Sequence, residues 1–121
     1  MSQADPAAAP PEADVVVVGA GPAGLAVAGC LVQAGIAPVL IEKARSVGSS
    51  WSGHYRRLHL HTVKEQSALP HRPFPTHYPR YVSRQQMVDY LADYARHFNL
   101  EPCFGEEAEA ITRAGSTWQV Q

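Results

Sequence analysis

The sequence is poor in several features that define particular classes of protein. Its 121 residues include only two cysteines, Cys30 and Cys103, and no Cys-x-x-Cys pair. Neither a disulfide scaffold nor a structural zinc site is therefore indicated, and a reducing cytoplasm suits this cysteine content best. Charge of one sign is not in excess either, because the formal net charge is -1. This balance gives no electrostatic reason to expect nucleic acid or an anionic membrane as a partner.

A long uninterrupted apolar run is also absent. Residues 15–35 contain few polar side chains, but glycines and Pro22 interrupt them directly after four consecutive valines. A strand, a turn and a helix therefore explain this stretch better than a transmembrane segment does. Residues 1–13 are rich in alanine and proline and lack the basic end and apolar run of a signal peptide. We expect them to form the disordered leader of a cytoplasmic protein.

The part of the chain after this leader begins with a predicted βαβ unit over residues 14–43. Val15–Val18 is β-branched without alternation, which is typical of a parallel strand buried on both faces. A predicted helix over 23–34 follows and ends before Gly35, a residue suited to the left-handed position after a helix. A second short apolar strand over 38–42 completes the unit.

The rest of the chain holds fewer regular elements. Residues 44–82 are rich in Gly, Pro, His and aromatic residues and predict a long irregular segment of the kind that is often functional. Ser83 and Gln86 form a capping-box pattern, and apolar residues then recur at helical spacing, so we expect a helix over 84–98. Two weak strand patterns predict a β-hairpin over 107–121. The sequence thus predicts a single domain of the α/β class.

A glycine motif lies between the first predicted strand and the first predicted helix. In Gly19-x-Gly21-x-x-Gly24, the first glycine permits a tight turn, the second lets the backbone approach a pyrophosphate, and the third lets the helix pack on the sheet. Pro22 suits the first helical position. The free N–H groups of the first turn, from Ala23 onward, and the helix dipole favour a diphosphate. A purely structural turn is the alternative interpretation.

Glu42, at the carboxyl end of the second predicted strand, specifies the nucleotide further. Its carboxylate can accept hydrogen bonds from both ribose hydroxyls, and its charge would repel a 2′-phosphate. The motif and this acid together therefore predict a site for FAD or NAD and not for NADP. An exposed glutamate without a ligand is the alternative.

The residues that follow resemble the N-terminal part of the flavin-containing monooxygenases, and most closely the YUCCA-like branch with its bacterial relatives. The resemblance extends from about Asp14 to Val120. It rests on an ordered series of short motifs: GSSW at 48–51, YRRLHLHT at 55–62, LP at 69–70, PFP at 73–75, YP at 78–79 and SRQQ at 83–86.

This resemblance implies a Rossmann-like FAD-binding βαβ unit of a two-dinucleotide-domain flavoprotein, with residues 14–121 as a truncated FAD-binding domain. In such monooxygenases NADPH reduces the flavin, and a flavin hydroperoxide then oxygenates a small organic substrate. The resemblance also implies roles for single residues. These are Gly19, Gly21 and Gly24 with Pro22 and Ala23 at the diphosphate, Glu42 and Lys43 at the ribose, Ala108 at the adenine, and Trp51, His61, Thr62 and Lys64 near the flavin.

Several alternatives stay open at this point. Trp51 is equally well explained as an ordinary core aromatic. His59 and His61 alternate as on a strand, but no third ligand is spaced to join them, so no metal site is predicted. No catalytic residue is identified, and the glycine motif expected for NADPH is absent from this chain. We therefore expect no turnover by these residues alone, and association through an unpaired sheet edge. The alternatives are an FAD- or NAD-dependent oxidoreductase without oxygenation and a non-catalytic nucleotide-binding module.

Overall fold

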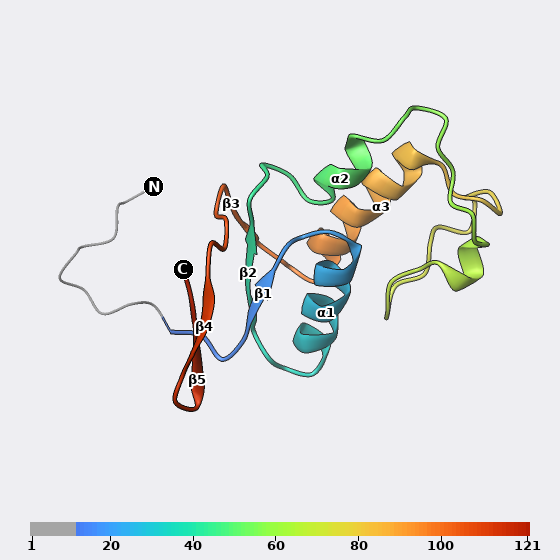
Figure 1. Ribbon diagram of the computed structural model, residues 1–121. Coiled ribbons are helices and arrows are strands. Elements are labelled where there is room, and N and C mark those ends of the chain that lie inside the picture. Colours follow the sequence, from blue (N-terminus) through green and yellow to red (C-terminus); the bar gives the residue numbers. More distant parts are fainter. Residues whose placement is uncertain (1–11) are drawn as a thin grey trace.

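A computed structural model describes residues 12–121 (Figure 1), so all but the last two residues of the predicted leader lie outside the described residues. The chain begins with β1 (Val16–Val18), α1 (Pro22–Gln33) and β2 (Val39–Glu42). The two strands are parallel, with Val17 opposite Leu40. The predicted βαβ unit is therefore present.

The end of α1 follows directly from its sequence. Gly35 has a φ of 82°, the left-handed conformation expected after the last helical turn. The N–H of Ile36 donates to the carbonyl of Leu31 at 2.9 Å, which satisfies an acceptor that the helix leaves free. The chain can then turn back into β2 without a longer connection.

A second helix and a third strand extend this unit. Helix α3 (Arg84–His97) begins with the expected capping box, because the Ser83 hydroxyl accepts from the N–H of Gln86 and the Gln86 side chain accepts from the N–H of Ser83. Strand β3 (Cys103–Phe104) then pairs in parallel with β2, so the sheet order is β1-β2-β3. The sequence did not predict β3, because two residues are too few for a strand pattern.

The described chain ends in a separate antiparallel hairpin of β4 (Ile111–Ala114) and β5 (Thr117–Val120). Strand β4 begins at Ile111, four residues after the start of the hairpin predicted over 107–121, but Ala110 still exchanges backbone hydrogen bonds with Gln121. Figure 1 shows this hairpin on one side of the three-stranded sheet and the helices on the other.

The hydrophobic core lies between the sheet and these helices. Helix α1 packs on β1, and α3 packs on α1. The two helices approach closely at Gly29, where an added Cβ would lie 2.3 Å from the hydroxyl oxygen of Tyr94. The buried apolar residues come from β1, β2, α1 and α3 and from four positions outside them, 20, 74, 82 and 98: Val17, Ala20, Leu25, Ala28, Leu40, Phe74, Val82, Met87, Tyr90, Leu91, Tyr94, Ala95 and Phe98.

The prediction that the first strand is buried on both faces is wrong for this chain. Val17 is 8% exposed, whereas its neighbours Val16 and Val18 are 38% and 49% exposed. Successive side chains of a strand point to opposite faces of the sheet, and the helices within residues 12–121 cover only one of them. The other face of β1 therefore remains accessible to solvent.

The predicted irregular segment contains two short helices, α2 (Ser49–Ser52) and the 3-10 turn η1 (Lys64–Gln66). It is nevertheless held by many backbone hydrogen bonds. Residues 58–64 run antiparallel to residues 80–84, and the N–H of Leu60 donates to the carbonyl of Val82 at 2.8 Å. None of the helices in residues 12–121 combines the length and apolar character that crossing a membrane requires.

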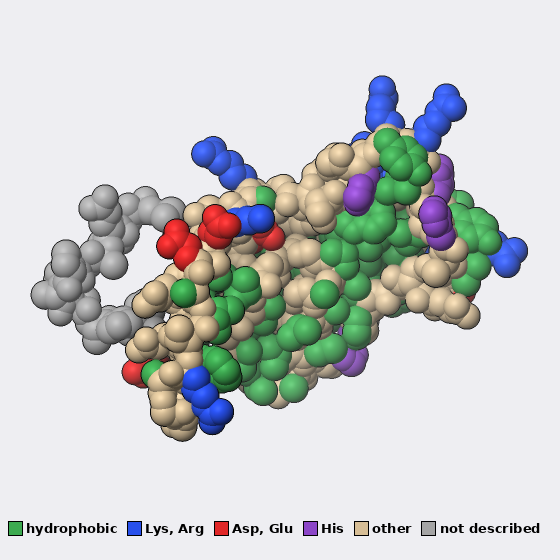
Figure 2. Space-filling view, in the orientation of Figure 1, with side chains coloured by type: hydrophobic (Ala, Val, Ile, Leu, Met, Phe, Trp, Pro, Cys, Tyr) green, Lys and Arg blue, Asp and Glu red, His purple; other side chains and the backbone are tan. Residues whose placement is uncertain are grey.

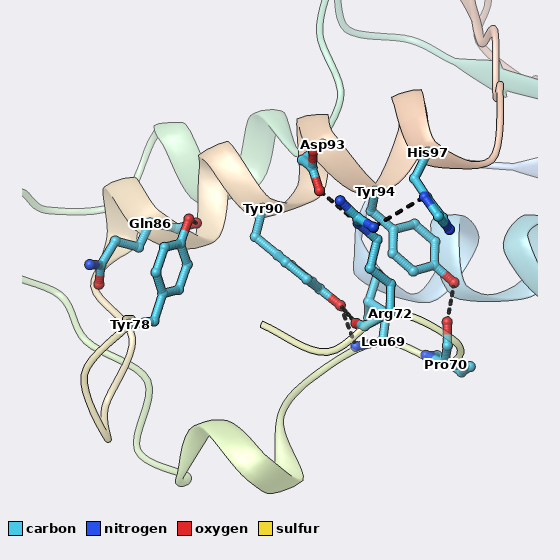
Figure 3. A network of polar contacts seen from close by, with 9 residues as sticks. All are labelled: Leu69, Pro70, Arg72, Tyr78, Gln86, Tyr90, Asp93, Tyr94 and His97. Atoms are coloured by element: carbon cyan, nitrogen blue, oxygen red, sulfur yellow. Dashed lines mark hydrogen bonds and ion pairs between the residues drawn. The ribbon is translucent and has the colours of Figure 1, made fainter. Parts of the chain in front are cut away.

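Two tyrosine hydroxyls of α3 anchor the next part of this segment (Figure 3). Tyr90 donates to the carbonyl of Arg72 at 2.6 Å and accepts from the N–H of Leu69 at 2.9 Å. Tyr94 donates to the carbonyl of Pro70 at 2.8 Å. Loop backbone that would otherwise lack partners is thereby tied to the helix.

Candidate dinucleotide site

The glycine turn has the geometry that its spacing predicts. Gly19 has a φ of 100°, and its N–H donates to the carbonyl of Ile41 at 2.8 Å. A Cβ on Gly24 would lie 1.8 Å from the carbonyl oxygen of Gly19, so the fold itself requires a glycine there. A Cβ on Gly21 would meet nothing within 4 Å. The space at Gly21 is therefore open, as the approach of a ligand to the backbone requires.

The first turn of α1 begins at this open position. Gly21 is the N-cap residue and offers no side-chain cap, and Pro22 follows within the first turn. The N–H groups from Ala23 onward thus have no side-chain acceptor, and they lie at the positive end of the helix dipole. An anionic diphosphate is the kind of group that such a helix start binds.

The Glu42 carboxylate is held in place beside this turn. It is only 9% exposed. One of its oxygens, Oε1, accepts from the N–H of Ala20 at 2.9 Å, and Oε2 accepts from the N–H of Ala44 at 2.7 Å. A carboxylate oxygen has two lone pairs, so each retains acceptor capacity for a hydroxyl. The side chain is therefore fixed in position before any ribose is bound.

A pocket of about 270 Å³ lies against the turn and the carboxylate. Four of the predicted site residues meet in it, from three separate parts of the chain. Its lining is Val18, Gly19, Ile41, Glu42, Lys43, Glu106, Glu107 and Ala108.

Sequence reasoning missed two acids of this pocket, Glu106 and Glu107. They follow β3, whose carboxyl end lies beside that of β2 because the two strands are parallel, and the N–H of Glu106 donates to the carbonyl of Glu42 at 3.1 Å. Figure 2 shows acidic side chains gathered near the β3 end of the visible face, with a basic side chain among them. Recognition of the two-residue β3 would have been needed to place these acids at the site.

The residues predicted to lie near a flavin are outside this pocket. Trp51 is half-buried in α2, with its ring edge to face with that of His54 at 5.3 Å. His61 and Thr62 are exposed. The Lys64 ammonium donates to two backbone carbonyls, those of Thr76 and Tyr78, at 3.0 and 2.7 Å. Lys64 therefore stabilises the conformation of the segment that contains it through these two hydrogen bonds.

Two other features do not define a site. A larger hollow of about 550 Å³ lies between α3 and the loops around residues 46–52 and 100–104, and it contains none of the predicted site residues. His59 contacts the carbonyl of Arg57 through Nδ1 at 2.7 Å. Within residues 12–121, no three His, Cys, Asp or Glu side chains are grouped as metal ligands would be.

The parallel βαβ unit, its glycine turn and the acid at the end of β2 define a dinucleotide-binding protein of the α/β class. A family model described as pyridine nucleotide-disulphide oxidoreductase matches residues 16–121. The chain therefore belongs to this family, which accords with the parallel sheet and with the position of Glu42.

Relatives with higher sequence identity to this chain are monooxygenases. The chain is 47% identical over 96 residues to the indole-3-pyruvate monooxygenase YUCCA6 of Arabidopsis thaliana, covering 78% of this chain and 23% of that protein. Among solved structures, the flavin-containing monooxygenase of Stenotrophomonas maltophilia matches with a TM-score of 0.79 at 28% identity, covering 88% of this chain and 32% of the other. The resemblance to flavin-containing monooxygenases is thus confirmed.

The fold alone does not select a reaction. The bacillithiol disulfide reductase of Bacillus cereus also matches with a TM-score of 0.79, at 26% identity, covering 88% of this chain and 32% of that chain. The chain spans about a quarter of the length of the curated relatives that it matches. What those proteins do as a whole therefore bears on this chain only as a proposal.

Proposed function

We propose that residues 14–121 form the FAD-binding part of an NADPH-dependent flavin monooxygenase. The observation that carries the proposal is the Glu42 carboxylate, fixed by the N–H groups of Ala20 and Ala44 in a pocket beside the glycine turn. Sequence identity of 47% over 96 residues to an indole-3-pyruvate monooxygenase supports an oxygenating enzyme. The cytoplasmic location predicted from composition is part of the same proposal.

Each part of the site has a distinct task in this proposal. The free N–H groups at the start of α1 hold the diphosphate, with Gly21 admitting it to the backbone. Glu42 accepts from the ribose hydroxyls, while Lys43 and Ala108 flank the adenosine. FAD, when bound, supplies the electron-transfer and oxygen chemistry. The protein groups named here bind and orient it.

In this proposal the acids of the pocket also discriminate against nucleotides that carry a 2′-phosphate. Glu42, Glu106 and Glu107 place three carboxylates around a pocket that holds one lysine, Lys43. A 2′-phosphate there would be repelled by like charge. NADPH should therefore not bind in this pocket, and in our proposal it binds outside these residues. We accordingly expect no complete catalytic cycle from these 121 residues alone.

Titration of the purified chain with FAD, followed by flavin fluorescence, tests the proposal. Gly21→Ala should lower the thermal midpoint only slightly and weaken FAD binding by about ten-fold, equivalent to about 1.4 kcal/mol. Glu42→Gln should weaken it by a similar factor, because a hydrogen bond to a charged acceptor is lost. Glu65→Gln, an exposed acid of η1 outside the pocket, is the matched control. Equal affinity of all four proteins for FAD would refute the proposed site.

A comparison of ADP-ribose with its 2′-phosphorylated form tests the selection separately. The parent chain should bind the unphosphorylated ligand more tightly. Glu106→Gln combined with Glu107→Gln should reduce the difference in affinity between the two ligands, because two charges that repel the 2′-phosphate are removed. If the double variant still prefers the unphosphorylated ligand as strongly as the parent chain does, Glu42 alone would account for this preference.

A second candidate function is an FAD-dependent oxidoreductase that transfers no oxygen. The equal TM-score of the bacillithiol disulfide reductase supports it. A third is a nucleotide-binding module without turnover, for which the pocket beside the glycine turn would suffice. Bleaching of the bound flavin by NADPH would disfavour the third. We also propose association through the open edge of β1, which light scattering can measure.

A further inference from the structure

The short helix α2, which carries Trp51, is attached to the glycine turn at its start. The N–H of Gly48, the residue before α2, donates to the carbonyl of Ala20 at 2.9 Å. Gly48 has a φ of 64°, and a Cβ there would lie 2.7 Å from Cδ1 of Leu91 on α3. The start of α2 is therefore fixed between the predicted diphosphate turn and the second long helix.

A side chain of α3 binds the end of α2, in addition to the packing of α2 on α3. Arg84, the first residue of α3, donates from Nη1 to the carbonyl of Ser52 at 3.0 Å, and Ser52 is the last residue of α2. The backbone N–H of Arg84 donates to the carbonyl of Leu58 at 2.8 Å, so the base of its side chain is also fixed. The guanidinium thus spans from α3 to the carbonyl end of α2, where a positive charge is favourable.

Arg84 is a poor choice for the stability of α3 itself. A positive charge in the first turn opposes the helix dipole, and the first turn of α3 contains no acid that would offset it. Among residues 12–121, the Nε of Arg84 is the one buried side-chain nitrogen or oxygen without a hydrogen-bond partner. A buried donor without a partner lowers stability. A neutral residue would avoid both costs, and within residues 12–121 the one hydrogen bond that the guanidinium makes is with α2.

We infer that Arg84 is a positioning residue, which holds α2 and hence Trp51 in a fixed place relative to the glycine turn. The inference rests on the proposed function only where it concerns the cofactor, since the attachment of α2 exists without a ligand. Gly48 and Arg84 hold the two ends of a four-residue helix, and Trp51 packs against the core, so loss of either end should give the indole more freedom of movement. In the proposed FAD complex, Trp51 would then lose its defined position at the flavin side of the site.

The fluorescence of Trp51 tests the attachment without any cofactor. Trp118 is 64% exposed, so Trp118→Phe should leave the fold intact and make Trp51 the sole tryptophan. In that background Arg84→Ala should shift the emission to the red and raise acrylamide quenching by roughly two-fold, because a freed indole meets more water. Arg84→Lys keeps a donor on a long chain and should restore most of the parent signal. Arg96→Ala, an exposed arginine of the same helix, is the control and should change neither.

FAD titration of the same proteins tests the consequence for the site. Arg84→Ala should weaken FAD binding by about ten-fold, the loss expected when one charge-assisted hydrogen bond orders part of a site. Failure of the parent protein to bind FAD would refute the proposed function but would leave the Trp51 result to decide the attachment. Unchanged emission and quenching in Arg84→Ala would overturn the positioning role. If that variant does not fold, as judged by circular dichroism, Arg84→Gln, whose shorter side chain cannot span to Ser52, replaces it in both measurements.

Discussion

The two faces of the three-stranded sheet differ although the same residue types form them. On the face toward the helices, Val17 and Leu40 are 8% and 3% exposed, whereas Val16, Val18 and Val39 on the other face are 38%, 49% and 39% exposed. The strands thus carry apolar side chains on both faces, but the helices in the described part of the chain cover only one of these faces. A buried layer needs a second packed layer, and strand pairing does not provide it.

The hairpin of β4 and β5 also shows that paired strands can leave their apolar side chains exposed. Strands β4 and β5 form a complete antiparallel register, yet Ile111 and Trp118 are 54% and 64% exposed. Backbone hydrogen bonds define this hairpin, and its apolar side chains contribute little burial. The covered side of the sheet therefore holds most of the stabilising contacts, and substitutions on the two sides should differ sharply.

The largest effect is expected at the centre of the covered side. Tyr94 is fully buried, so Tyr94→Ala should lower the free energy of unfolding by about 4 kcal/mol. Tyr55→Ala, at a tyrosine that is 67% exposed, should change it by less than about 0.5 kcal/mol. Urea denaturation of both variants measures the difference. Similar losses at the two positions would contradict the contrast between the packed and the open parts.

The next largest effect is expected where α1 meets the turn. Gly24→Ala forces a Cβ against the carbonyl of Gly19 and should cost about 3 kcal/mol of unfolding free energy. Gly21→Ala meets no such contact and should cost less than about 1 kcal/mol. Thermal unfolding followed by circular dichroism compares the two. Equal thermal midpoints of the two variants would mean that the turn can shift to accommodate a Cβ at position 24.

A direct comparison of the two faces uses neighbouring valines of one strand. Val17→Thr buries a hydroxyl in an apolar layer and should lower the free energy of unfolding by about 2 kcal/mol. Val18→Thr, on the open face, should change it by less than about 0.5 kcal/mol. The two substitutions are chemically identical, so urea denaturation isolates the effect of the covering layer. A loss at Val18 as large as that at Val17 would show that the second face is covered in solution.

The smallest effect concerns the hydroxyl of Tyr94. Burial, with smaller contributions from the nearby Cys30 and Tyr90, raises the pKa of Tyr94 from 10.0 to about 12. The unfolded chain therefore loses this proton first, so the stability is fully present below pH 10 and is lost as the pH rises to about 12. Tyr94→Phe should cost about 1 kcal/mol at neutral pH and reduce the alkaline loss. Urea denaturation at several pH values measures both, and an unchanged slope would assign the alkaline loss to other groups.

Much of the structure on the covered side of the sheet could be predicted from residues close together in the sequence. The turn at Gly19, the end of α1 at Gly35 and the capping box at Ser83 each depend on residues within a few positions of one another. Their geometry could therefore be predicted from spacing and residue type. The same holds for the place of Glu42 at the carboxyl end of β2.

Contacts between distant residues could not be predicted in this way. The sequence indicated neither the pairing of β3 with β2, which brings Glu106 and Glu107 to the pocket, nor the attachment of Arg84 to Ser52 across 32 positions. It also predicted burial of both faces of β1, because an apolar strand pattern reports only which side chains are apolar. Whether another layer covers them is decided by the rest of the fold.

The sequence by itself thus determined the glycine turn, the acid beside it and the helices α1 and α3, because each follows from short-range hydrogen bonding and backbone conformation. Only the tertiary structure decided which carboxylates meet at the turn, which face of the sheet is buried, and how α2 is held. These depend on where separate segments pack, and packing free energy is a property of surfaces that residues distant in the sequence build together.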